Sequence, residues 1–73
     1  MAQEIRAEMV ANVWKILVTQ GDSVADGDTL VILESMKMEI PVPAEVVGVV
    51  KEMTVIEGDV VNEGDSIAVI DQS

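Results

Sequence analysis

Apolar and polar residues alternate along most of this 73-residue chain, in short runs that are separated by Gly-Asp pairs. Alternation with a period of two is typical of strands with one buried face, and Gly-Asp pairs favour turns. No stretch of useful length shows the period of an amphipathic helix. The chain is therefore predicted to be all-β, with about eight short strands. Those that the pattern defines lie at 13–19, 23–24, 29–34, 37–42, 49–56, 60–61 and 66–71.

The chain contains an internal repeat. Sliding the sequence against itself by 37 positions aligns Gly21–Asp28 with Gly58–Asp65, and the two segments share Gly, Asp, Val, Gly and Asp in register. Conservative matches extend the repeat to about residues 10–35 and 47–72. Two copies of a unit that cannot close a core alone are expected to pack about a pseudo-two-fold axis. Residues 1–73 are thus expected to form a single domain, a flattened β-barrel or sandwich.

Two details of the repeat carry expectations about single residues. Gly48 aligns with Ala11, so if that site needs a positive φ, Asn12 is expected to take the strain in the first copy. Trp14 is the only aromatic residue of the chain. It is expected to pack inside the barrel rather than to serve as a binding platform. Pro41 and Pro43 lack an N–H, so their strand is expected at a sheet edge or to end there.

Composition and charge narrow the possible functions. Hydrophobic residues make up 49% of the chain, and the aliphatic ones are mainly Val and Ile, which suit strands. The chain has no Cys and no His, which removes the usual catalytic base, the thiol nucleophile and the commonest transition-metal ligands. Its turn Asp residues lack EF-hand spacing. An autonomous enzyme and a metal site are therefore not expected.

The net charge of −10 argues against binding to nucleic acid or to an anionic membrane, because it would repel phosphates. The first ten residues carry three charges and no continuous apolar run, and no apolar run in the chain approaches the length of a membrane span. We therefore expect a cytoplasmic protein. A closed barrel with this charge is expected to be a monomer.

The segment Glu34–Glu39 joins two apolar strands without the Gly, Asn or Pro of an ordinary turn. The pseudo-symmetry places Lys37 at the end of the barrel opposite both chain ends. A two-residue type I′ turn here would force positive φ on side-chain-bearing residues, which costs strain. The ordinary interpretations are a solvated lysine and core-filling methionines, with Met38 turned inward beside Ile40. Exposed Met36 and Met38 would instead indicate a docking partner.

The placement of Met36-Lys37-Met38 between two copies of Gly-Asp-x4-Gly-Asp resembles the biotinyl domains, also called biotin carboxyl carrier domains, over about residues 4–71. Among these, the chain is most similar to small free-standing biotin/lipoyl attachment proteins. The resemblance implies two four-stranded antiparallel sheets with quasi-two-fold symmetry. It also implies that a biotin protein ligase attaches biotin covalently to Lys37. Biotinyl-Lys37 would then carry carboxyl groups between biotin carboxylase and carboxyltransferase subunits.

The residues beside Lys37 are then expected to be recognised by the ligase and the other partners: Glu34, Ser35, Met36, Met38 and Glu39. Ser35 stands where many family members have Ala, a change that could alter ligase preference. Lipoyl domains, which share the fold, usually place Asp before and Ala after the acceptor lysine, so the two methionines favour biotin. A lipoate carrier on the same lysine and an unmodified interaction module remain alternatives. Lysine amines are mostly protonated near neutral pH, so the ligase must supply both the base and the activated acyl donor.

Overall fold

The computed structural model describes residues 2–72, and within that range it contains eight β-strands. The strands follow the predicted alternation, because inward-facing positions are apolar and outward-facing positions are largely polar. None of the described residues forms a helix that is long and apolar enough to cross a membrane. The strands are β1 (Ala2–Arg6), β2 (Ala11–Ile16), β3 (Ser23–Val24), β4 (Thr29–Ser35), β5 (Met38–Pro43), β6 (Gly48–Met53), β7 (Val60–Val61) and β8 (Ser66–Gln72).

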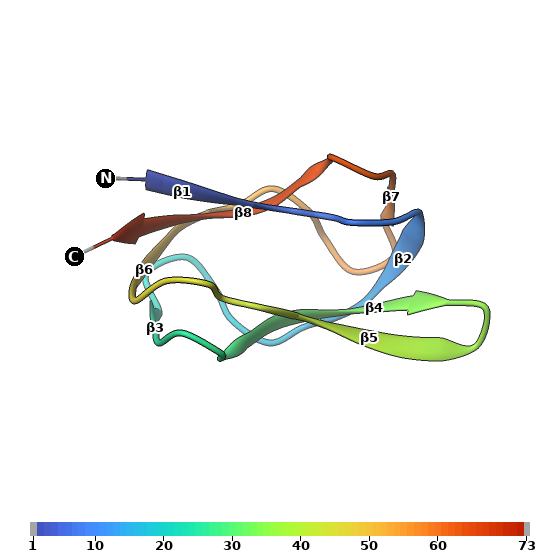
Figure 1. Ribbon diagram of the computed structural model, residues 1–73, viewed down its shortest axis with the longest axis horizontal. Helices are drawn as coiled ribbons and strands as arrows, with labels where there is room; N and C mark the ends of the chain where they lie inside the picture. The colour runs from blue at the N-terminus through green and yellow to red at the C-terminus, as the bar shows by residue number, and fades with distance from the viewer. Residues whose placement is uncertain (1, 73) are drawn as a thin grey trace.

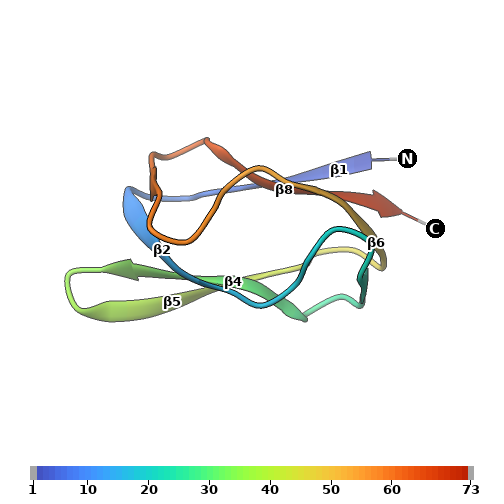
Figure 2. The same ribbon diagram turned by 180° about the vertical axis from the view of Figure 1, so that it is seen from behind.

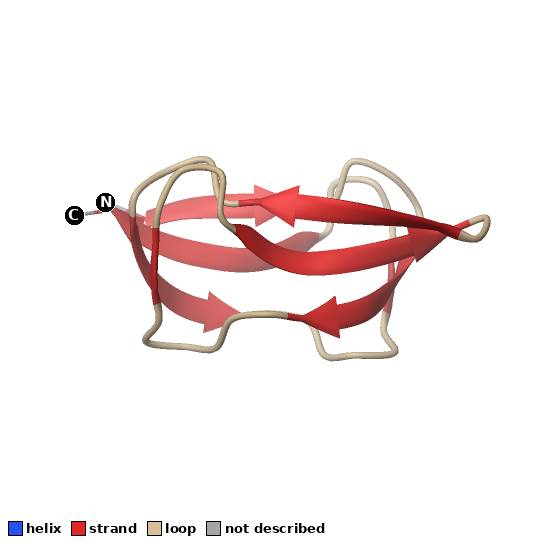
Figure 3. Ribbon diagram, turned by 90° about the horizontal axis from the view of Figure 1, so that it is seen from below, coloured by secondary structure: helices blue, strands red, loops and turns tan. Residues whose placement is uncertain are grey.

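The strands form two four-stranded antiparallel sheets, in the orders β1-β8-β6-β3 and β5-β4-β2-β7. The sheets face each other in an elongated, flattened barrel, with β1 and β8 above β4 and β5 in Figure 1, and Figure 3 shows the barrel from below. The predicted fold class is therefore confirmed. β5 lies at the edge of its sheet, as its two prolines predict. Both chain ends lie at one end of the long axis (Figure 1).

The same offset of 37 positions relates one sheet to the other. It maps β2 onto β6, β3 onto β7 and β4 onto β8, and each of β2 and β6 has a register shift at the equivalent place. The offset also maps β5 back onto β1, and the following Ala44-Glu45 onto Ala7-Glu8. The structural repeat thus includes a segment that lies before residue 10 in the first copy. Nearly every described residue has an equivalent in the other half.

The core consists of aliphatic side chains and alanines from both halves, and no polar or charged side chain among the described residues is buried. Leu30 and its equivalent Ile67 are both 0% exposed, and Leu33 and Ile70 form a second equivalent pair. Residues from β2 and β6 complete the contact between the sheets. Apolar burial is the main source of stability in a chain with no disulfide.

Four similar turns connect the strands, and each contains Gly at its third position and Asp at its fourth. In the turn that ends at Asp22, Gly21 has a φ of 96° and the Asp22 N–H donates to the Thr19 carbonyl over 3.0 Å. A positive φ at the third position is the feature of a type II turn that favours Gly. The Asp22 carboxylate accepts a hydrogen bond from the Thr19 N–H. The aspartates at the fourth positions of these turns therefore stabilise the turn backbone.

Of the two expectations about single residues, the condition for strain at Asn12 is not met, and the expectation for Trp14 is wrong. Neither Asn12 nor Gly48 has a positive φ. Gly48 is required for a different reason, because a Cβ there would lie 2.2 Å from the Asp71 carbonyl oxygen. Trp14 does not pack inside the barrel but is 43% exposed. The register shift between Val13 and Lys15 leaves both Trp14 and Lys15 on the outside, where the lysine Nζ lies 5.7 Å from the indole ring.

Candidate functional site: the Lys37 hairpin

The β4–β5 hairpin ends in a two-residue turn made by Met36 and Lys37. Ser35 pairs with Met38 as the last rung of the ladder. Met36 has a φ of 51° and Lys37 a φ of 66°, and they are the only described residues other than glycine with a positive φ. Positive φ at both central positions is the geometry of a type I′ turn, the strained arrangement considered for this link from its sequence. Holding two side-chain-bearing residues in this region costs about 1–3 kcal/mol each.

The hairpin tip projects beyond the barrel at the end opposite the chain ends, which Figures 1 and 2 show from two sides. β2 accompanies β4 only as far as the pairing of Asn12 with Glu34. Beyond that point β4 and β5 pair only with each other, so the tip is a two-stranded ribbon without a neighbouring strand. The predicted position of Lys37 is therefore confirmed.

All three residues at the tip are exposed. Met36 is 91% exposed and Met38 is 63% exposed. The alternative in which Met38 turns inward beside Ile40 is wrong, because Met38 lies where the ribbon has passed the end of the barrel. Ile40, two residues further on, is partly buried against the core. The tip thus presents two flexible apolar side chains on either side of an amine.

Carboxylates flank the tip. Glu34 and Glu39 form a directly opposed cross-strand pair, and a single row runs across the sheet from Val60 through Asn12 to these two residues. Like charges in such a pair repel each other. Ser35 is half-buried beside them. Within residues 2–72, no carboxylate forms an ion pair with Lys37, so the amine is available to another molecule.

The structure therefore brings all six of the predicted site residues together on one hairpin. No group of three or more acidic, His or Cys side chains in the described part of the chain is arranged to hold a metal. One feature was missed at the sequence level, a cavity between β1 and β5 with Glu8 and Glu45 beside it. The identity of Ala7-Glu8 with Ala44-Glu45 at the offset of 37 was the available signal.

A projecting lysine on a strained turn between two halves of a doubled β scaffold is the arrangement expected of a carrier domain. A family model described as "Biotin-requiring enzyme" matches residues 3–70, almost the whole chain. The chain belongs to this family. Its fold and its relatives identify it as a biotin carboxyl carrier domain.

Curated relatives include small biotinylated proteins. The chain is 61% identical over 44 residues to the "Biotinylated protein TB7.3 homolog" of Mycolicibacterium smegmatis. It is 48% identical over 40 residues to the "Biotin/lipoyl attachment protein" of Bacillus subtilis. The aligned segments span 60% of this chain and 62% of the first relative, and 55% of this chain and 55% of the second.

The carrier domain also resembles parts of much larger enzymes. Urea carboxylase from Kluyveromyces lactis superposes with a TM-score of 0.91 and 37% identity, covering 97% of this chain but 6% of that one. A single-chain, multi-domain long-chain acyl-CoA carboxylase superposes with a TM-score of 0.91 and 28% identity, covering 99% of this chain and 7% of that one. The same scaffold thus occurs within large carboxylase chains.

Proposed function

We propose that Lys37 is the biotin attachment site, that a biotin protein ligase loads it, and that the carrier moves carboxyl groups between a biotin carboxylase and a carboxyltransferase. The exposed amine at the apex of the type I′ turn is the observation that carries this proposal. The names of the biotinylated relatives support biotin as the attached group, and the carboxylases with the same fold support its use as a carboxyl carrier. The domain itself is proposed to be a substrate and carrier without a catalytic site of its own.

The residues at the tip fit the attachment reaction. The Lys37 Nζ attacks the activated carboxyl carbon of biotin and forms an amide bond. The bond from that carbon to the activating group breaks, and Nζ loses a proton. Among residues 2–72, no carboxylate forms an ion pair with the Lys37 amine that would have to break before the reaction. The rigid turn fixes the direction in which the amine leaves the barrel, which lowers the entropy lost when a ligase binds it.

When attached, biotin would supply a ring nitrogen that accepts and releases a carboxyl group. The contribution of this chain is then to hold that group away from its own surface and to present it to two enzymes in turn. Met36 and Met38 offer adaptable apolar contacts to differently shaped partners. Glu34, Ser35 and Glu39 are proposed to complete the recognition surface. The negative charge of the chain would speed its approach to basic partner surfaces.

Intact-mass measurement tests the attachment site. After incubation with a biotin protein ligase, ATP and biotin, the chain should gain the mass of one biotin less one water, and Lys37→Arg should gain nothing. Lys51→Arg is the matched control, because Lys51 is also an exposed lysine, and it should be labelled normally. Labelling of Lys37→Arg, or no labelling of the unmodified sequence, would overturn the proposal. A gain of one lipoate less one water with a lipoate ligase alone would favour the lipoyl alternative.

Two further parts of the proposal concern the setting of the protein. The carrier is proposed to act in the cytoplasm, where ATP is available to the ligase and to the biotin carboxylase. It is also proposed to be a monomer, supported by its net charge and by the two prolines on the β5 edge. Light scattering on the purified chain should return a mass near 7.8 kDa before loading. A stable dimer would contradict the second point.

A further inference from the structure

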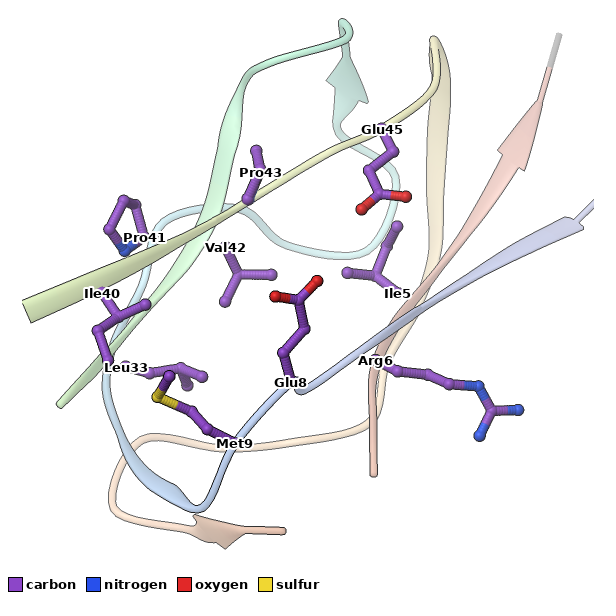
Figure 4. A pocket seen from close by; sticks show the side chains of 10 residues that line it. All are labelled: Ile5, Arg6, Glu8, Met9, Leu33, Ile40, Pro41, Val42, Pro43 and Glu45. Carbon is purple, nitrogen blue, oxygen red and sulfur yellow. The ribbon is translucent and has the colours of Figure 1, made fainter. Parts of the chain in front are cut away.

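A cavity of about 220 Å³ lies between the two sheets, on the open side where the edge strands β1 and β5 face each other. Its floor is apolar and consists of the buried side chains of Ile5, Leu33 and Val42. Ile40 and Pro41 continue this apolar lining along β5. Figure 4 shows the Glu8 and Glu45 side chains extending toward this space from opposite segments. The cavity therefore combines an apolar floor with two acidic groups.

No cation of the described chain neutralises these two carboxylates. Glu8 and Glu45 are both exposed, and neither forms an ion pair within residues 2–72. Arg6 also borders the cavity, but its guanidinium pairs with Glu4 and donates to the Gly64 carbonyl oxygen. In Figure 4 the Arg6 side chain points away from the cavity. Water solvates these exposed carboxylates in the free domain, and a cation that pairs with both has to come from another molecule.

The cavity is not symmetric, although it lies where two equivalent segments meet. Glu8 and Glu45 are equivalent in the repeat. Leu33, Ile40 and Pro41 line the cavity, whereas their counterparts Ile70, Gln3 and Glu4 do not. The cavity thus extends along the β5 side, toward Lys37. Ile40 is three residues from Lys37, which is about 10 Å along a strand. A protein that holds the hairpin tip can therefore also reach this part of the surface.

The edge of β5 restricts the kind of contact that such a protein makes. Pro41 and Pro43 have no N–H to donate, so a partner cannot extend this sheet with a regular strand. Side chains must then supply the contact. A side chain with an aliphatic stem and a cationic end matches an apolar floor beside two carboxylates. An anionic or purely apolar group leaves the carboxylates repelled or unpaired.

We propose that this cavity receives a lysine or arginine side chain of the biotin protein ligase, as a second contact beside the Lys37 hairpin. The inference rests on the proposed function, because it assigns the occupant to the enzyme that loads Lys37. It separates recognition into two parts. The hairpin supplies the amine and the apolar contacts, while the cavity fixes the orientation of the domain through one cation.

Small probes test the chemistry of the cavity without any partner. n-Butylguanidinium and n-butylurea have similar shapes but differ in charge. The guanidinium should shift the methyl NMR signals of Ile5, Ile40 and Val42 in a saturable, salt-sensitive manner, and the urea should bind at least fivefold more weakly. Glu8→Gln with Glu45→Gln should remove this preference. Equal binding of the two probes, or no binding of either, would overturn the proposal.

Kinetics of biotinylation test the occupant. Glu8→Gln with Glu45→Gln should lower kcat/KM for the ligase about tenfold, mainly through a higher KM. The control is Glu52→Gln with Asp26→Asn, which removes the same charge from exposed residues that do not line the cavity, and it should change kcat/KM less than twofold. Circular dichroism and thermal unfolding should show both double variants folded. If both are loaded at the same rate, the cavity proposal fails while the proposed function stands. If the unmodified sequence is not loaded at all, the proposed function itself fails.

Discussion

The two ends of the barrel are built alike but carry different side chains. At the Lys37 end, one row of cross-strand neighbours runs Val60, Asn12, Glu34, Glu39. At the end with the chain termini, the equivalent row runs Ser23, Val49, Asp71, Ala2. The backbone pairing is the same, yet two opposed carboxylates flank the first tip and only one lies in the second row. The scaffold is doubled, whereas the chemistry is present once.

The outer faces of the two sheets also carry different side chains at equivalent positions. Trp14 is equivalent to Lys51, and Leu17 is equivalent to Thr54. Trp14 and Leu17 are 43% and 51% exposed, so apolar surface remains uncovered on the sheet that carries Lys37. Thr54 instead donates a hydrogen bond to the Ser66 carbonyl oxygen. The outer face of the other sheet is not free of apolar groups, because Val49 of β6 is 40% exposed. What sets the Lys37 sheet apart is the exposed aromatic ring of Trp14, which points to contacts made by that sheet.

Truncating equivalent core residues provides the largest expected effect and tests whether the scaffold is truly doubled. Leu30→Ala and Ile67→Ala should each lower the free energy of unfolding by about 2–5 kcal/mol, because both side chains are fully buried. Denaturant unfolding should give values for the two variants within about 1 kcal/mol of each other. A large difference would show that one half dominates the stability, and the two ends could then no longer be compared on an equal scaffold.

Exchanging Gly48 and Ala11 tests where the two halves differ in backbone packing. Gly48→Ala should destabilise by about 1–3 kcal/mol, because the new Cβ would displace the Asp71 carbonyl. Ala11→Gly should cost about 0.5–1 kcal/mol, the ordinary penalty for Gly in a strand. Thermal unfolding of both variants measures the difference. Equal losses would mean that the close approach at Gly48 relaxes easily.

Met36→Gly tests separately how the strained Lys37 turn affects stability and how it affects biotinylation. Gly adopts a positive φ freely but loses more entropy on folding, so the net gain in unfolding free energy should be less than about 1 kcal/mol. The rate of biotinylation should nevertheless fall severalfold, because the amine is held less firmly and an apolar contact is removed. Faster loading of this variant would argue that rigidity of the tip is unimportant.

Replacing Trp14 and Lys51 by Thr should have the smallest effect on folding. Both residues are exposed, so each change should alter the unfolding free energy by about 0.5 kcal/mol or less. The two variants should differ in partner binding instead. Carboxyl transfer by the loaded carrier should slow with Trp14→Thr and stay unchanged with Lys51→Thr. The same rate of carboxyl transfer for both variants would contradict the inference that the exposed Trp14 surface contacts a partner.

Much of this molecule could be predicted because the sequence repeats itself. The Gly-Asp turns and the alternating Val and Ile residues defined the strands, and the offset of 37 placed Lys37 opposite the chain ends. The positions of Trp14 and Met38 could not be predicted from alternation, because they depend on a β-bulge and on where a neighbouring strand stops. The role of Gly48 depended on a contact with Asp71, which is distant in sequence. Local patterns carry no information on such contacts.

The position of the termini has a consequence for fusion to other domains. A polypeptide that continued from either end would leave the barrel at the pole farthest from Lys37, on a body whose longest dimension is 36 Å. Any such extension would lengthen the reach of the amine without shielding it. The design therefore suits a free carrier and a module at the end of a flexible arm equally well.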